Sequence, residues 1–255
     1  MTARAGMELR PKCMFWALLL LVTAPHADNA AVTLARSVFQ GLAKFEPSAP
    51  LVIDSPEDYL GPGDRAVPFS IKLNDGPLMG REQHQLRPYS GPLGEGLHEY
   101  LLNANESQVL GFDARADLVV IGAIDRKEGV MTRFTPPKPL LIQGAPGTRR
   151  HETVSVEVID LLRPEKRLHE GRLEVDVVYR GALMMDLSGE QLLAVLMDST
   201  AVGKIGPATI EDRQYRLYAE DLGLIASREL QKVSAFAVYR RSIDELRLLI
   251  TDPPS

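Results

Sequence analysis

An alternation of apolar and charged residues over residues 172–180 constrains the fold of this chain more than any other feature. Leu173, Val175, Val177 and Tyr179 fall on one side of an extended chain, and the other side carries mostly charged residues. Successive side chains of a β-strand point to opposite faces, so a strand with one buried and one solvated face has a period of two. A helix would need apolar residues three or four positions apart. The sequence therefore predicts a β-strand here.

Further strand-like segments surround this one, with turn residues between them. Val154, Val156 and Val158 alternate in the same way, which predicts an antiparallel partner strand. We expect residues 162–172 to form a long charged loop between the two strands, because Pro164 cannot donate a hydrogen bond to a sheet ladder. The later strand-like segments are residues 192–197, 208–220 and 233–241.

Two parts of this C-terminal region leave a choice open. Residues 191–198 are either a short helix capped by Ser188 or a strand that follows a tight turn, and a short apolar run does not decide between them. The β-rich neighbours favour the strand. In residues 208–220, the side that carries Tyr215 and Leu217 is the expected inward face.

The N-terminal half contains shorter strand-like segments with Pro- and Gly-rich connections. Residues 125–129 have the composition of a hairpin turn. The prolines in residues 136–139 predict a rigid bend between two halves of one sheet, with a subdivision of the domain at this point as the alternative. The segments expected to be strands are residues 69–73, 97–102, 107–112, 117–124 and 130–134.

Residues 1–30 have the pattern of an export signal. Arg4, Arg10 and Lys12 form a basic head, and residues 13–24 form an apolar run of the length of a signal core. This run is shorter than the roughly 20 apolar residues that span a bilayer. We expect a cleaved signal, with an uncleaved N-terminal anchor as the alternative. Membrane contact is expected only through this segment, if it is uncleaved.

Residues 31–68 are expected to hold one helix and a Pro/Gly-rich connection, ahead of a β-rich domain at residues 69–255. Within residues 33–45, Leu34 and Val38 begin a series of apolar residues at helical spacing, which predicts an amphipathic helix. We expect this helix to pack on the sheet. The alternative is a segment that meets a partner or a membrane.

Charge and cysteine content exclude several classes of function. The formal net charge of −5 gives no electrostatic reason to expect nucleic acid or an anionic membrane surface as a partner. Cys13 is the only cysteine and lies in the expected signal, so the exported chain would have no disulfide and no thiolate for zinc or nucleophilic chemistry. An exported protein of this kind fits the periplasm of a Gram-negative bacterium, or secretion from one.

The sequence contains no motif that assembles a recognisable catalytic or cofactor site. It lacks the Gly-x-Ser-x-Gly elbow of serine hydrolases and the Gly-rich turn of dinucleotide folds. Residues 144–150 resemble a phosphate loop only superficially, and a turn before a strand accounts for them. We predict no catalytic residue, no cofactor and no metal. The histidines show no paired spacing for a metal, and alanine substitutions are expected to leave function intact at His84, His98, His151 and His169.

Tyrosines and arginines on the predicted C-terminal strands form the one candidate ligand site. If some of them share a concave face, they make an aromatic, cationic wall for a sugar or for an acyl chain with an anionic head group. The alternative is ordinary core tyrosines with exposed arginines. The candidate residues are Tyr179, Arg180, Tyr215, Arg216, Tyr218 and Tyr239.

A resemblance to a family rests on the C-terminal part of the chain. Residues 170–181, a Gly-containing turn at residues 188–191 and residues 204–229 follow one another, and the residues that carry the pattern are Gly206, Pro207, Tyr215, Tyr218 and Gly223. This pattern resembles β-rich exported bacterial proteins of unknown function of the DUF3108 type. The resemblance implies a curved antiparallel sheet in the periplasm, similar in outline to lipoprotein-carrier half-barrels, and it carries over no catalytic residue. The expected fold is mainly β, a curved antiparallel sheet or half-barrel with one N-terminal amphipathic helix after a signal peptide.

Two hypotheses of function follow. The first is a non-enzymatic envelope protein that binds a lipid, a glycan or a protein partner. The second is a secreted hydrolase with an acid–base pair drawn from Asp, Glu and His. The lack of a nucleophile motif, of an exported cysteine and of metal-ligand spacing favours the first hypothesis.

Overall fold

The computed structural model describes residues 67–73, 78–187, 190–219, 222–236 and 239–249. The expected export signal, the expected helix and nearly all of the connection after it lie outside the described residues. Within the described ranges, no helix is long and apolar enough to cross a membrane.

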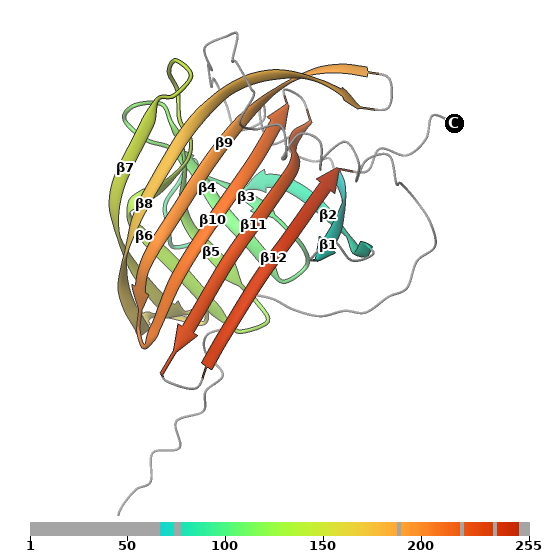
Figure 1. The fold of residues 1–255 in the computed structure, drawn as a ribbon. Helices are drawn as coiled ribbons and strands as arrows, with labels where there is room; N and C mark the ends of the chain where they lie inside the picture. Colours follow the sequence, from blue (N-terminus) through green and yellow to red (C-terminus); the bar gives the residue numbers. More distant parts are fainter. Residues whose placement is uncertain (1–66, 74–77, 188–189, 220–221, 237–238, 250–255) are drawn as a thin grey trace, which may run out of the picture.

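The described residues form an antiparallel sheet of twelve strands (Figure 1). In chain order the strands are β1 (Val67–Leu73), β2 (Leu78–Pro88), β3 (His98–Leu101), β4 (Glu106–Phe112), β5 (Leu118–Asp125), β6 (Val130–Leu141), β7 (Arg149–Asp160), β8 (Arg163–Leu187), β9 (Glu190–Ile205), β10 (Ala208–Ala219), β11 (Gly223–Ala235) and β12 (Tyr239–Leu249). Each strand pairs with the next one along the chain, and β1 also pairs with β12, so the sheet closes into a barrel. The predicted mainly β fold with a curved antiparallel sheet is confirmed, and β1 extends it to a closed ring.

The strand with the clearest alternation is the longest one described, β8. Leu173, Val175, Val177 and Tyr179 are all buried, as the period of two predicts. Residues 191–198 belong to β9, so the strand alternative is correct for them. β8 and β9 reach beyond their neighbours and curve over the end of the barrel drawn at the top of Figure 1.

The charged loop expected over residues 162–172 is wrong, because β8 already begins at Arg163. Residues of opposite charge meet across β7 and β8 and allow the chain to stay extended. Arg163 Nη2 lies 2.6 Å from Asp160 Oδ2, and Arg167 Nη1 lies 3.6 Å from Glu157 Oε1. Opposite charges on neighbouring strands stabilise the pairing. The charge run is therefore a solvated stretch of strand.

Two further strand predictions need correction. The single strand expected over residues 233–241 is wrong, because β11 ends at Ala235 and β12 begins at Tyr239. Phe236, between them, has a φ of +53°, which is a turn conformation. β2 is absent from the sequence-based prediction, since its sequence shows no alternation of apolar residues.

The hairpin turn predicted at residues 125–129 is confirmed. In the hairpin between β5 and β6, Asp125 Oδ1 accepts a hydrogen bond of 2.9 Å from the backbone N–H of Glu128, and Gly129 has a φ of +67°. Residues 136–139 lie inside β6, at a point where the pairing of β5 with β6 shifts register. The sheet continues on both sides of these prolines.

Candidate functional site

A cavity of about 240 Å³, partly open to solvent, lies inside the barrel. β10 contributes alternate residues to its wall, namely Ile210, Asp212, Gln214, Arg216 and Tyr218. The expected inward face of this strand, which carries Tyr215 and Leu217, is therefore wrong. Tyr215 and Leu217 lie on the opposite side of β10, because successive side chains of a strand alternate in direction.

Polar side chains from three adjacent strands form one wall of this cavity. Residues that are directly paired across strands present their side chains on the same face. The register places Gln214 of β10 beside Glu229 of β11, and Glu229 beside Glu245 of β12. A second row begins with Arg216 and continues through Ser227 to Arg247. We call these two rows, together with Asp212, the polar wall.

Arg247 is the central cation of the polar wall. Its Nη1 lies 3.5 Å from Glu229 Oε2 and its Nε lies 3.8 Å from Glu82 Oε2, and a guanidinium nitrogen also contacts Glu245. Burial disfavours the charged guanidinium, but Glu245, Glu229 and Glu82 outweigh this effect and raise its pKa. A buried cation with several carboxylate partners remains charged, and removing it leaves those carboxylates uncompensated.

Two carboxyl groups of the polar wall hold their protons unusually well. Burial raises the pKa of Asp212 to about 6, and nearby Glu229 adds to the shift while Lys138 and Arg216 oppose it. Burial raises the pKa of Glu245 to about 7, against the attraction of Arg247. Both groups therefore change charge close to neutral pH.

Hydrogen bonds satisfy the carboxyl group of Asp212 only on one side. Its Oδ2 accepts a bond of 2.9 Å from Gln214 Nε2. Its Oδ1 is buried and has no hydrogen-bond partner among the described residues. An unpaired buried acceptor is costly, so this oxygen is a place where a donor from a ligand would be favourable.

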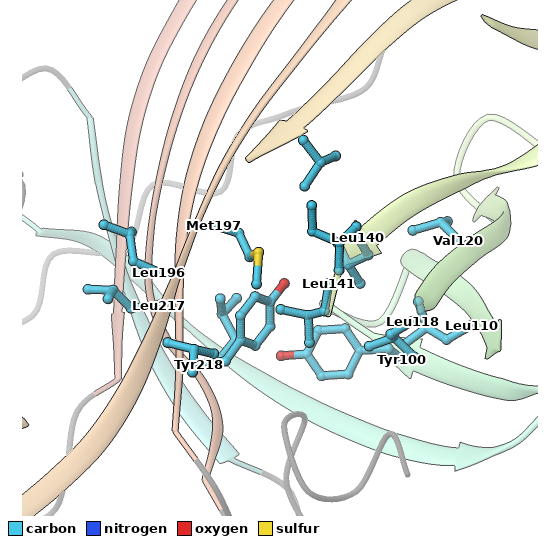
Figure 2. Close-up of a cluster of buried hydrophobic side chains, with 14 of the residues drawn as sticks. Tyr100, Leu110, Leu118, Val120, Leu140, Leu141, Leu196, Met197, Leu217 and Tyr218 are labelled. Carbon is cyan, nitrogen blue, oxygen red and sulfur yellow. The ribbon is translucent and has the colours of Figure 1, made fainter. Parts of the chain in front are cut away.

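Aromatic and apolar side chains line another part of the cavity. Tyr100 of β3 and Tyr218 of β10 approach each other across the interior, with Leu140, Leu141 and Met197 around them (Figure 2). Burial raises the pKa of both tyrosines, so both hydroxyls stay protonated and can donate hydrogen bonds. The interior thus combines aromatic faces with polar groups.

His84 contacts the side chain of Tyr100. Its Nδ1 lies 2.8 Å from the Tyr100 hydroxyl, and its Nε2 lies 3.2 Å from Glu82 Oε2. The ring of Phe69 stacks on the imidazole with a centroid distance of 4.0 Å. Burial lowers the pKa of His84, although Glu82 acts in the opposite direction. The neutral imidazole therefore links Tyr100 to the carboxyl group of Glu82.

The structure brings two of the six predicted site residues to the cavity wall, Arg216 and Tyr218. Tyr179 is fully buried in the hydrophobic core beside it. Tyr239 is the first residue of β12 and is not part of the cavity lining.

The other two predicted site residues belong to a cluster on the outer side of the sheet. Arg180 Nη2 donates to Asp198 Oδ2 at 2.6 Å. Arg213 donates to the same carboxylate at 3.2 Å and lies 4.7 Å from the centroid of the Tyr215 ring. Arg180 and Tyr215 are therefore separated from Arg216 and Tyr218 by the sheet itself.

Among the described residues, His98, His151 and His169 do not line the cavity. His98 lies on β3, within the segment predicted to be a strand, and His169 lies on β8, in the segment wrongly expected to be a loop. His151 is exposed, and its ring nitrogens lie 3.3 Å from Glu174 and 3.3 Å from Asp176. Within the described ranges, no group of three or more His, Cys, Asp or Glu residues could hold a metal ion.

Sequence reasoning missed most of the polar wall, although a signal for it exists. In three successive strands, polar residues recur at every second position of the inward face: Asp212, Gln214 and Arg216, then Ser227, Glu229 and Gln231, then Glu245 and Arg247. Such a series is expected for a wet interior, since small barrels can enclose ligand cavities. Period-two polarity on neighbouring strands is the pattern that would have predicted the site.

Comparison with protein-family models finds no matching family, and comparison with curated proteins finds no matching relative. The resemblance to the DUF3108 type is therefore not confirmed. Solved structures of bacterial proteins described as an exported protein or as lipoproteins do show similarity, at low levels.

One similar structure is a presumed exported protein with a YmcC-like fold from Bacteroides fragilis, with 10% sequence identity and a TM-score of 0.39 over 75% of this chain and 96% of that chain. A second is the hypothetical lipoprotein YmcC from Escherichia coli, with 12% identity and a TM-score of 0.35 over 91% of this chain and 100% of that chain. A third is a presumed lipoprotein from Parabacteroides distasonis, with 9% identity and a TM-score of 0.36 over 75% of this chain and 95% of that chain. Likeness at this level assigns no function to the chain.

Proposed function

We propose that this protein is a non-enzymatic envelope protein that holds a sugar unit of a glycan inside its barrel. The observation that carries the proposal is the cavity, whose lining joins the rings of Tyr100 and Tyr218 to carboxyl, amide and guanidinium groups. A sugar ring presents C–H groups to aromatic faces and hydroxyl groups to polar side chains. The export signal expected at the N-terminus supports a role in the envelope.

The same lining argues against an acyl chain as the occupant. Asp212, Glu229 and Arg216 face the interior, and an acyl chain could not hydrogen-bond to them. The volume of about 240 Å³ also lies below the roughly 300–1,000 Å³ of pockets for drug-sized ligands. A single compact polar unit, with the rest of its chain outside, fits this volume better than a lipid tail.

The experiment is native mass spectrometry of the mature protein purified from a bacterial envelope, followed by denaturation and identification of any released molecule. We expect a saccharide to be released. Ala201→Phe, which projects a ring into the cavity from β9, should abolish the bound mass. Val202→Phe is the matched control, because Val202 is the next residue on the same strand, points outward and is 48% exposed. A released acyl lipid, or equal occupancy of both variants, would overturn the proposal.

One observation favours a hydrolase as the second candidate. Asp212, with a pKa raised to about 6, lies in a cavity near a second carboxyl group, Glu229, and glycosidases use one carboxylic acid and one carboxylate. If the protein cleaves its glycan, incubation with the released saccharide should produce new reducing ends, and Asp212→Asn should stop their formation. A saccharide that stays intact on prolonged incubation would exclude this candidate.

A further inference from the structure

The cavity has more carboxyl groups around it than cations. Arg228 also borders the cavity, but its guanidinium donates two hydrogen bonds to Asp244, at 3.1 and 3.0 Å. Apart from this ion pair, the described residues around the cavity include five carboxyl groups and three cations. The carboxyl groups are those of Glu82, Glu106, Asp212, Glu229 and Glu245, and the cations are Lys138, Arg216 and Arg247.

The cations are already engaged by part of this acidic set. Arg247 lies within ion-pair distance of Glu82, Glu229 and Glu245. Arg216 is 8% exposed and, with Lys138, attracts the carboxylate of Asp212. Three cations leave two carboxyl groups without a compensating charge. Burial raises the pKa of Asp212 to about 6 and that of Glu245 to about 7, so in the protein alone these two groups take up protons as the pH falls below neutral.

Asp212 also offers an oxygen that nothing in the described part of the chain occupies. The residue is 9% exposed and lines the cavity, and its Oδ1 accepts no hydrogen bond. A carboxylate is an acceptor only, so its partner must be a donor, and a charged donor forms the strongest bond. This unpartnered oxygen is independent of the charge count, and both observations call for a cationic donor.

We propose that the sugar unit held in the barrel carries a free ammonium group, as an unacetylated amino sugar does, and that Asp212 binds this group. The inference rests on the proposed function and names the substrate class of the same site. The ammonium group supplies the missing positive charge and donates to Oδ1. The ring of the sugar then faces Tyr100 and Tyr218, and its hydroxyl groups meet Gln214 and Gln231. A neutral sugar would leave the charge of the polar wall uncompensated.

Three trisaccharides that differ only at C2 of each ring test this proposal. They are a trimer of β-1,4-linked glucosamine, its fully N-acetylated form and the corresponding glucose trimer. Binding to the full mature protein is measured by calorimetry near neutral pH. We expect the glucosamine trimer to bind about ten-fold more tightly than the other two, because a charge-assisted hydrogen bond to a buried carboxylate is stronger than a neutral one.

Variants locate the effect on the proposed residue. Asp212→Asn keeps the shape of the side chain and removes its charge, and it should abolish the preference for the glucosamine trimer over the two neutral trimers. Asp176→Asn changes a 40%-exposed aspartate on the outer face of β8 and should leave the preference intact. Circular dichroism and thermal unfolding confirm that both variants are folded.

The outcomes separate this inference from the proposed function. A preference for the glucosamine trimer that Asp212→Asn abolishes supports both. Equal binding of all three trimers, or tighter binding of an uncharged one, overturns the ammonium inference and leaves the glycan function standing. A preference that survives in Asp212→Asn also overturns it, because the ammonium group then binds elsewhere. If none of the trimers binds, the inference fails with the saccharide function on which it rests.

Discussion

β8 and β10 are separated by one strand, yet the central residues of their inward faces differ in polarity. On β8 the residues that face the interior are apolar, such as Leu173, Val175 and Val177. On β10 they are Asp212, Gln214 and Arg216. The register pairs Val175 with Ala201 of β9, and Ala201 with Asp212. The inward side chains therefore change from apolar to charged within a single row of the sheet. Alternation therefore identifies a strand, but the polarity of its two faces does not reveal which one is inside.

Val175→Asp should have the largest effect of the changes that test this contrast. Val175 is fully buried, and its neighbours in the same row are Glu152 and Ala201, with Asp212 beyond. A buried carboxylate without a cation should lower the free energy of unfolding by about 4 kcal/mol or more, or prevent folding. Urea denaturation followed by circular dichroism measures the change.

Val202→Asp is the control for this substitution. Val202 lies on the outer face of β9 and is 48% exposed. Glu174 and Glu211 are its neighbours in the row, so the same change there should cost about 1 kcal/mol or less. Equal stability of the two variants would show that the β8 wall is hydrated like the β10 wall, and the contrast between them would disappear.

Asp212→Asn should have an intermediate effect of the opposite sign. The pKa of Asp212 rises from an ordinary value of 3.8 to about 6 on folding, so the unfolded chain loses this proton first as pH rises. Stability therefore falls from about pH 4 to about pH 6 and stays lower above that range. The variant has no such proton and should be up to about 3 kcal/mol more stable near pH 7. Urea denaturation at several pH values measures both curves.

The other charged groups around Asp212 set the control for this pH dependence. Lys138 on β6, Arg216 on β10 and Glu229 on β11 act on its charge and are unchanged in the variant. Asp244→Asn, which alters an aspartate paired with Arg228, should retain the fall in stability between about pH 4 and pH 6. If Asp212→Asn is less stable than the unmodified protein near neutral pH, the ionised carboxylate of Asp212 stabilises the fold, and the expected rise of its pKa on folding is wrong.

Arg213→Ala should have the smallest effect, because it acts on the outer face of the same strand. Its guanidinium is 47% exposed, where an ion pair with Asp198 and a contact with the Tyr215 ring are screened by water. Such interactions each contribute about 1 kcal/mol or less. Thermal unfolding should show a small downward shift. A loss as large as that of Val175→Asp would mean that the outer cluster, not the interior, holds β8, β9 and β10 together.

The sequence predicts strands well where the interior is apolar and poorly where it is polar. β5 and the central part of β8 have apolar inward residues, and their prediction is correct. β2 places the polar residues Glu82 and His84 toward the interior, so its sequence lacks the alternation of apolar and polar residues that marks a strand. The start of β8 also lacks this alternation, because its residues are mostly charged and pair with charges on β7, as Arg167 does with Glu157. Polar residues on the inward face of β2 and paired, solvated charges at the start of β8 are thus the physical reasons for two of the misplaced elements.

The candidate site could be predicted only in part for the same reason. Arg216 and Tyr218 are among the predicted ligand-binding residues because arginine and tyrosine are typical of binding surfaces. Asp212 and Glu245 resemble any solvated acidic residue in a linear sequence, and only the register of β10, β11 and β12 brings them to one wall. The raised pKa of each group depends on burial by strands that are distant in sequence, which no local pattern encodes.

Closure through β1 has a consequence for how the chain reaches this state. β1 is the first described strand to be synthesised, and its neighbour β12 is the last. Until β12 is complete, a partly folded chain exposes unpaired edges, and such edges add strands from other chains readily. Forming this long-range pairing late also slows folding, because many residues separate its two strands. The closed ring is therefore most vulnerable to aggregation just before its final strand docks, and a chaperone would have its greatest effect at that step.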